Sequence, residues 1–170
     1  MRESRSIDAS VFAEARSCGL DPVIARIVAG RITSDTPLEA ILAPQLQHIA
    51  PPSLLTDIHR AADRLQQAIL QNERIGVLTD YDADGLTSHA VIIESLLRFG
   101  VSRQKLTHWI GHRLDDGYGI SEALVDRLLD STPLPEVLIS ADCGSSDEAQ
   151  IARLQASGID VIVTDHHQVS

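Results

Sequence analysis

From residue 75 onward, short apolar runs alternate with amphipathic segments. The runs are rich in β-branched residues and predict strands at residues 75–79, 105–110, 136–141 and 160–164. The segments between them repeat apolar residues at helical spacing and predict helices at residues 86–100, 121–131 and 146–158. The strands lack the alternation of polar and apolar residues that is typical of a sheet with one solvent-exposed face. The order of elements therefore predicts an α/β domain, a parallel sheet flanked by helices.

The first 50 residues have a different pattern. They predict short helices at residues 12–19, 21–31 and 36–44. Two prolines at residues 51–52 mark a break, and apolar residues then recur at helical spacing over residues 53–71. We therefore expect a short helical N-terminal region, residues 1–52, followed by the α/β domain at residues 53–170.

Composition narrows the class of protein. A chain of 170 residues that is 44% hydrophobic can bury a core. No apolar stretch is long enough to span a membrane, and the N-terminus lacks the apolar segment of a signal peptide. Two cysteines do not make a disulfide framework, so we expect a cytoplasmic protein. Aromatic residues make up 3% of the chain, which is few for a platform that stacks bases.

The net charge of −10 is distributed unevenly. Residues 1–74 hold 8 basic and 9 acidic residues, whereas residues 75–170 hold 6 basic and 15 acidic ones, a net charge of −9. This excess of acid argues against nucleic-acid binding through a basic surface. Acids gathered at a few points are instead typical of metal sites, where a bound cation offsets their charge. The positions of the acids therefore decide between the two interpretations.

Acidic residues directly follow three of the predicted strands. The strand ends read IGVLT-DYDADG, VLISA-DCGSS and VIVT-DHHQ. The carboxyl ends of parallel strands meet at one edge of a sheet, where open α/β sheets bind ligands. The residues expected to converge at this edge are Asp80, Asp82, Asp84, Asp142, Asp165, His166 and His167.

Each cluster by itself also has an ordinary explanation. The aspartates of DYDADG suit a solvated turn with an aspartate as helix cap, in which Gly85 permits a tight turn, and Asp142 suits the N-cap of the next helix. An EF-hand is excluded because its glycine and glutamate spacing is absent. Taken together, acids and adjacent histidines favour a metal site. Imidazole and carboxylate ligands suit Mn²⁺, Zn²⁺ or Fe²⁺, and the abundance of carboxylates favours Mn²⁺ or Mg²⁺.

These motifs resemble those of a known family. DYDADG, ADCG and VTDHH are similar to the first three motifs of the DHH phosphoesterase superfamily. RLDDGYGIS at residues 113–121 and the upstream segments IARIVAGRI, PLEAILAP and ADRLQQAI resemble the RecJ exonucleases within it. The resemblance covers the whole chain and implies a Rossmann-like DHH domain. Thr79 and His112 stand where those exonucleases commonly have Gly and Asn, and neither is an expected ligand.

The resemblance implies phosphodiester hydrolysis with two divalent cations, Mn²⁺ or Mg²⁺. The metal ligands that it implies are Asp82, Asp84, Asp142 as the bridging group, and His166. Asp80 and Asp165 are the expected supporting carboxylates, which orient ligands through hydrogen bonds.

Further residues are expected to contact the substrate phosphate. His167 would lie near it, and the planar guanidinium of Arg113 suits phosphate oxygens. Gly117 and Gly119 would let the backbone approach the substrate. The alternative for Arg113 is a surface ion pair with one of the two aspartates at residues 115–116.

The resemblance implies a 5′→3′ exonuclease of DNA repair and recombination. Its substrate would be single-stranded DNA, its candidate partners a single-stranded-DNA-binding protein and a helicase, with no membrane partner. The family completes its site with a further downstream aspartate, a DHH-associated domain and an OB-fold. We therefore expect this chain to be the first half of a catalytic core, inactive or weakly active by itself.

Two other functions stay open. One is a DHH phosphoesterase that acts on small molecules or short oligonucleotides, and the other is a non-catalytic domain that binds metal or a partner protein. The GYG motif and the helical N-terminal region favour the exonuclease.

Overall fold

The computed structural model describes residues 5–45, 47 and 49–168, and the chain forms two compact units, Met1–Leu54 and Leu55–Ser170. The first unit contains α1 (Ala9–Ser17), α2 (Pro22–Ala29), α3 (Leu38–Leu42) and the 3-10 turn Pro52–Leu54. Its small core is built on Ala15, Ala25 and Leu38. Asp8 and Asp21 cap α1 and α2 with their side chains.

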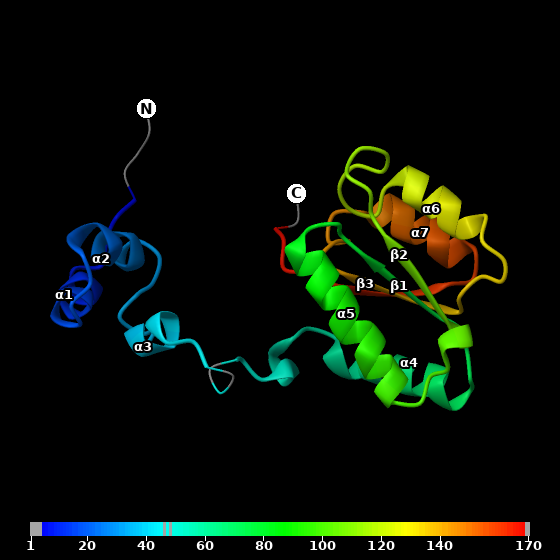
Figure 1. Cartoon of the computed structure of the whole chain (residues 1–170), viewed down its shortest axis with the longest axis horizontal. Coiled ribbons are helices and arrows are strands. Elements are labelled where there is room, and N and C mark those ends of the chain that lie inside the picture. Colours follow the sequence, from blue (N-terminus) through cyan, green and yellow to red (C-terminus); the bar gives the residue numbers. More distant parts are fainter. Residues whose placement is uncertain (1–4, 46, 48, 169–170) are drawn as a thin grey trace. The chain divides into compact units, whose positions relative to one another are not determined.

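The second unit is a four-stranded parallel sheet with helices on both faces (Figure 1). Its elements are α4 (Ile58–Leu70), β1 (Ile75–Thr79), α5 (Ala83–Arg98), the 3-10 turn Arg103–Lys105, β2 (Leu106–Ile110), α6 (Glu122–Leu129), β3 (Val137–Ala141), α7 (Glu148–Ala156) and β4 (Asp160–Thr164). The strand order is β2-β1-β3-β4. The predicted fold class is therefore confirmed. No described helix is long and apolar enough to cross a membrane.

Alternate residues of the central strands serve two cores. Val77 and Ile139 join the core beneath α4 and α5, whereas Leu78 and Leu138 join the core beneath α6 and α7. Every residue of β1 and β3 is buried. Strands covered on both faces read as continuous apolar runs, which explains why their sequences lack polar alternation.

The register of the sheet aligns the ends of three strands. Thr79 of β1 lies opposite Ala141 of β3, and Ala141 lies opposite Thr164 of β4. Asp80, Asp142 and Asp165 come directly after these residues. Three acids far apart in the sequence are thus delivered to one edge, as the motifs predict.

The starts of α5 and α4 are among the helix boundaries that differ from the expectation. We expect a helix from residue 86, but α5 begins at Ala83, because the side chain of Asp82 accepts hydrogen bonds from the N–H groups of Asp84 and Gly85. We expect α4 to begin near residue 53, but it begins at Ile58 after a residue, Asp57, with the left-handed φ of 58°.

Candidate metal centre

The loop after β1 is held by its own aspartates. Oδ1 of Asp82 lies 2.9 Å from the backbone N of Asp84 and 3.1 Å from that of Gly85. These N–H donors, that of Gly85 first, lower the pKa of Asp82, so the carboxylate stays ionised. The capping explanation is therefore correct for Oδ1 of Asp82.

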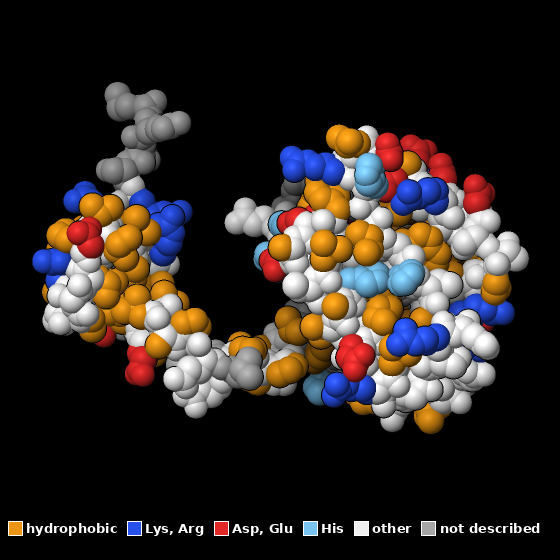
Figure 2. Space-filling view, viewed as in Figure 1, with side chains coloured by type: hydrophobic (Ala, Val, Ile, Leu, Met, Phe, Trp, Pro, Cys, Tyr) orange, Lys and Arg blue, Asp and Glu red, His pale blue; other side chains and the backbone are white. Residues whose placement is uncertain are grey.

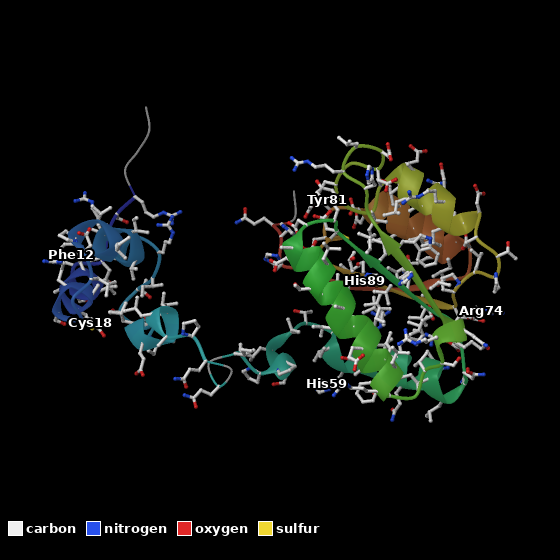
Figure 3. All side chains as sticks on the ribbon, in the orientation of Figure 1. Phe12, Cys18, His59, Arg74, Tyr81 and His89 are labelled. Carbon is white, nitrogen blue, oxygen red and sulfur yellow. The ribbon has the colours of Figure 1, made fainter. Side chains whose placement is uncertain are left out.

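Gly85 is required for close packing and not for the tight turn that the sequence predicts. It lies within α5 rather than in a left-handed turn, and a Cβ there would be 2.2 Å from the carbonyl oxygen of Asp80. The glycine therefore permits the start of α5 to approach the end of β1 closely. This contact brings the carboxylates of Asp80, Asp82 and Asp84 to the sheet edge. Figure 3 shows Tyr81 in this loop and Arg74 at the other end of β1.

Asp80 is the most enclosed acid of this loop. It is 5% exposed, and its burial raises its pKa, with the neighbouring charges of Asp82 and Asp142 adding to the effect. A carboxylate in such surroundings gains from a nearby cation, which would offset both the desolvation and the repulsion.

Asp142 follows β3 in a conformation that side-chain-bearing residues rarely adopt. Its φ is 64°, and its backbone N–H donates to the carbonyl oxygen of Thr164. Its side chain is buried, Oδ1 contacts His166, and Oδ2 has no hydrogen-bond partner among the described residues. A buried carboxylate oxygen without a partner is costly. This oxygen is the observation that fits a cation at the site.

Asp165 is the anchor of the last turn. Its carboxylate accepts hydrogen bonds from the backbone N–H groups of Ser145, His166 and His167, at 2.8–3.1 Å, and from the ring of His167. Burial alone would raise the pKa of Asp165, but these donors hold it well below its ordinary range. The turn that carries both histidines is thereby fixed at the end of β4.

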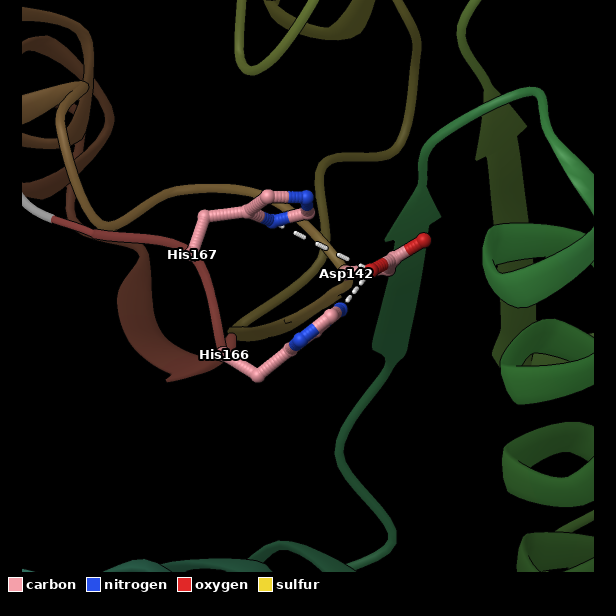
Figure 4. A group of neighbouring side chains, drawn as sticks. All are labelled: Asp142, His166 and His167. Atoms are coloured by element: carbon pink, nitrogen blue, oxygen red, sulfur yellow. Dashed lines mark hydrogen bonds and ion pairs between the residues drawn. The ribbon is translucent and has the colours of Figure 1, made fainter. Parts of the chain in front are cut away.

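The two histidines differ in what they face. Nε2 of His166 lies 3.0 Å from Oδ1 of Asp142 (Figure 4). The same nitrogen lies 3.9 Å from Oδ2 of Asp84. Nδ1 of His167 lies 2.7 Å from Oδ1 of Asp165 and 4.0 Å from Oδ1 of Asp142. The Asp165 carboxylate raises the pKa of His167. His166 is therefore directed at Asp142, whereas His167 is held by Asp165.

Among the residues that the structure describes, two groups of side chains bring ligand atoms within 4.8 Å of one another, namely Asp80–Asp82–Asp142 and Asp142–His166–His167. Asp142 belongs to both groups, which suits the bridging role expected for it. In the second group the Nδ1 atom of His167 is occupied by Asp165, so His166 is the better ligand. Asp80 joins the first group, which makes it a candidate ligand as well as a supporting residue. Such a set of carboxylates and imidazole suits a divalent cation such as Mn²⁺.

A cavity of about 530 Å³ opens beside these groups. Asp84, Asp142 and His166 line it on the sheet edge, and Ser88 and Val91 line it along α5. Figure 2 shows acidic and histidine side chains close together where α5 begins. Thr87 lies inside α5, where its hydroxyl donates to the carbonyl of Ala83.

The loop between β2 and α6 carries the residues expected at the phosphate. Arg113 is exposed, with its guanidinium 5.9 Å from the ring centroid of Tyr81. Its alternative ion pairs are not formed, since His112 pairs with Asp115, and Arg127 pairs with Asp116. The roles predicted for Arg113 and the metal ligands stay predictions.

The two glycines of this loop are unlike each other. Gly117 and Gly119 have left-handed φ values of 77° and 83°. Open space surrounds Gly117, whereas a Cβ on Gly119 would lie 2.8 Å from Oδ2 of Asp147. Gly119 is buried and packs against the protein, and a contact of either glycine with substrate stays a prediction.

Sequence reasoning overlooks Tyr118, which lies between these glycines. Its hydroxyl is 2.9 Å from Nδ1 of His167, and the two rings meet edge to face. The available signal was its place within the GYG motif. Cys143, in contrast, is a small buried residue, and burial raises its pKa to about 12, so the thiol stays protonated at neutral pH.

Comparison with known proteins places this geometry in a family. The model of the DHH family, N-terminal domain, matches residues 74–170. The chain belongs to the DHH family. The single-stranded-DNA-specific exonuclease RecJ of Thermus thermophilus is 37% identical over 113 residues, which cover 66% of this chain and 16% of that protein. RecJ of Salmonella typhimurium is 32% identical over 167 residues, which cover 98% of this chain and 27% of that protein.

A solved structure of the DHH family agrees with the fold. The crystal structure of exonuclease RecJ bound to manganese superposes with a TM-score of 0.62 and 34% identity, covering 72% of this chain and 30% of that one. The predicted resemblance to RecJ is therefore confirmed. The chain spans about a sixth to a quarter of the length of the curated relatives it matches.

Proposed function

We propose that this DHH-family chain supplies most of the metal centre of a RecJ-like exonuclease, which hydrolyses phosphodiester bonds of single-stranded DNA in the 5′→3′ direction. The observation that carries the proposal is the buried, unpartnered Oδ2 of Asp142, in a side chain shared by two groups of candidate ligands. The names of the relatives, single-stranded-DNA-specific exonucleases, supply the substrate class.

In this proposal, Asp82, Asp84, Asp142 and His166 hold two divalent cations, Mn²⁺ or Mg²⁺, with Asp80 beside them. Bound cations of this kind activate a water molecule and stabilise charge on the phosphoryl oxygens. The chain's own residues prepare the site for that task. Asp82 fixes the start of α5 through Oδ1.

In the same proposal, Asp165 positions the histidines, and other residues contact the substrate. Asp165 holds the turn of His166 and His167 through backbone N–H groups, so that the imidazole of His166 stays beside Asp142. His167 and Arg113 then face the substrate phosphate, where a ring N–H and a planar guanidinium suit its oxygens. Gly117 is the glycine at which the backbone is open to such an approach.

The proposal also includes the domain organisation, the location and the partners of the enzyme. Residues 1–52 form a helical lead-in to the DHH domain at residues 53–170, and further domains of a longer enzyme complete the site. The enzyme acts in the cytoplasm, in DNA repair and recombination. A single-stranded-DNA-binding protein and a helicase are its candidate partners.

Hydrolysis assays at high protein concentration test the proposal. With Mn²⁺ present, we expect slow release of nucleotides from 5′-phosphorylated single-stranded DNA, and no release by Asp142→Asn, which keeps the shape of the side chain. Faster cleavage of a dinucleotide than of long DNA would favour the small-molecule phosphoesterase. Tight Mn²⁺ binding with no Mn²⁺-dependent binding or cleavage of either substrate would favour a non-catalytic metal-binding domain.

A further inference from the structure

The hydroxyl of Tyr118 lies 2.9 Å from Nδ1 of His167, a ring nitrogen that also contacts the carboxylates of Asp165 and Asp142. The direction of this contact follows from Asp165. The Asp165 carboxylate accepts backbone N–H groups with both oxygens, so it is an acceptor toward His167 as well. Nδ1 of His167 therefore carries the proton, and it is the donor in its contacts with Asp165 and Tyr118.

The Tyr118 hydroxyl oxygen thus accepts a hydrogen bond from Nδ1 of His167, and the hydroxyl proton of Tyr118 remains free to be donated to another group. Nδ1–H of His167 is shared between Oδ1 of Asp165 at 2.7 Å and the Tyr118 oxygen at 2.9 Å, as a three-centre hydrogen bond allows. No other described group accepts the Tyr118 O–H. A phenol donor without a partner accordingly stands beside the metal centre, where Nδ1 of His167 is 4.0 Å from Asp142.

Hydrogen bonds on both sides hold the loop that carries Tyr118. The loop is braced on one side, where Oδ2 of Asp116 accepts the N–H of His112 and a guanidinium N–H of Arg127. On the other side, Oδ2 of Asp147 accepts the N–H of Ile120.

The glycines on either side of Tyr118 complete this brace. Gly117 and Gly119 adopt left-handed φ values, which other residues rarely adopt, and a Cβ at residue 119 would displace the Asp147 carboxylate, 2.8 Å away, that accepts from Ile120. The phenol is 55% exposed, so its hydroxyl can reach a ligand.

We propose that the Tyr118 hydroxyl donates a hydrogen bond to a phosphate oxygen of the substrate at the metal centre. This inference rests on the proposed function and adds a contact to it. Partial burial, with the surrounding carboxylates adding to the effect, raises the pKa of Tyr118 to about 12, so the phenol remains a donor at neutral pH. A phosphate monoester or diester is the ligand class that such a donor, next to bound cations, selects.

Binding of thymidine 5′-monophosphate to the Mn²⁺-saturated chain, followed by calorimetry, tests the inference. Tyr118→Phe keeps the ring and removes only the hydroxyl, so we expect Mn²⁺ affinity within twofold of the parent and nucleotide affinity about tenfold lower. Tyr81→Phe removes the hydroxyl of the other tyrosine and should leave both affinities unchanged. Equal nucleotide binding by Tyr118→Phe and the parent would overturn the inference.

Nitrogen NMR of His167 in the metal-free chain gives a second test that does not depend on catalysis. At a pH where the ring is neutral, we expect the Nδ1–H tautomer and a change of the Nδ1 shift in Tyr118→Phe. An Nε2–H tautomer would make Tyr118 the donor to His167 and would overturn the inference. A parent chain that binds Mn²⁺ but no nucleotide would instead count against the proposed function.

Discussion

Nε2 of His166 lies 3.0 Å from Oδ1 of Asp142, although 24 residues separate them in the sequence. The contact joins the ends of β3 and β4, which the register of the sheet sets side by side. It leaves Oδ2 of Asp142 buried and without a partner among the described residues. A cation at this point would therefore satisfy an oxygen that the protein itself does not.

Replacing Asp142 by Ala should weaken Mn²⁺ binding more than any other single change. Asp142 belongs to both groups of candidate ligands, so its loss removes an oxygen from each. We expect at least a tenfold lower affinity in isothermal titration calorimetry, since even groups that only orient ligands cost about 10–100-fold. Asp130→Ala, an exposed aspartate at the end of α6, is the matched control. Equal losses in the two variants would remove Asp142 from the site.

The sequence was sufficient to predict the sheet and the convergence of the acids. Both follow from apolar runs that end in aspartate, and parallel strands place such ends at one edge. The start of α5 could not be read in the same way. DYDADG offers Asp82 and Asp84 as caps and Gly85 as a turn residue, and the choice among them depends on the contact of Gly85 with Asp80.

Contacts between distant loops could not be predicted from the sequence either. Tyr118 and His167 are 49 residues apart, and no periodicity links a loop tyrosine to a strand end. The anchoring of Asp165 on the N–H of Ser145 likewise depends on the turn after β3. Motifs thus identify which residues carry the chemistry, whereas packing decides which of them touch.

Variants of Asp82 separate capping from metal binding. Asn caps a helix as well as Asp does, so Asp82→Asn should keep α5 intact and leave metal-free stability unchanged or slightly raised. Asp82→Ala loses the cap and should lower the melting temperature by about 2–4 °C.

The response to Mn²⁺ completes this test. A cation that binds only the folded chain at a hundredfold excess over Kd adds about 2.7 kcal/mol to the free energy of unfolding. Calorimetric melting with and without Mn²⁺ should show this gain in the parent and in neither variant. An intact Mn²⁺ response in Asp82→Asn would leave Asp82 as a cap alone.

The contribution of Asp80 to the stability of the metal-free chain should become less favourable as pH rises above about 4, because its pKa is raised. Burial raises that pKa above the ordinary 3.8, so the folded chain binds the proton more tightly than the unfolded chain does. Its contribution to folding is complete below pH 3.8 and is lost as pH rises through the folded-state pKa. Asp165 and Asp82 have lowered pKa values, and their effects fall below this window.

Asp80→Asn isolates this effect in chelator-treated protein. Urea unfolding should give a higher free energy of unfolding for the variant than for the parent at pH 7, and the difference should shrink toward pH 4. A difference that does not change between these pH values would show that Asp80 titrates normally in the folded chain.

Gly85→Ala should both destabilise the fold and impair the metal centre. The new Cβ would lie 2.2 Å from the carbonyl oxygen of Asp80, a backbone atom that cannot move without displacing the end of β1. We expect a loss of at least about 2 kcal/mol in the free energy of unfolding, together with weaker Mn²⁺ binding. Gly158→Ala is the control, because residue 158 has a φ of 82° and open space, so it costs only about 1–2 kcal/mol of backbone strain. Unchanged Mn²⁺ affinity in a folded Gly85→Ala would show that the Asp80 loop is not positioned by this contact.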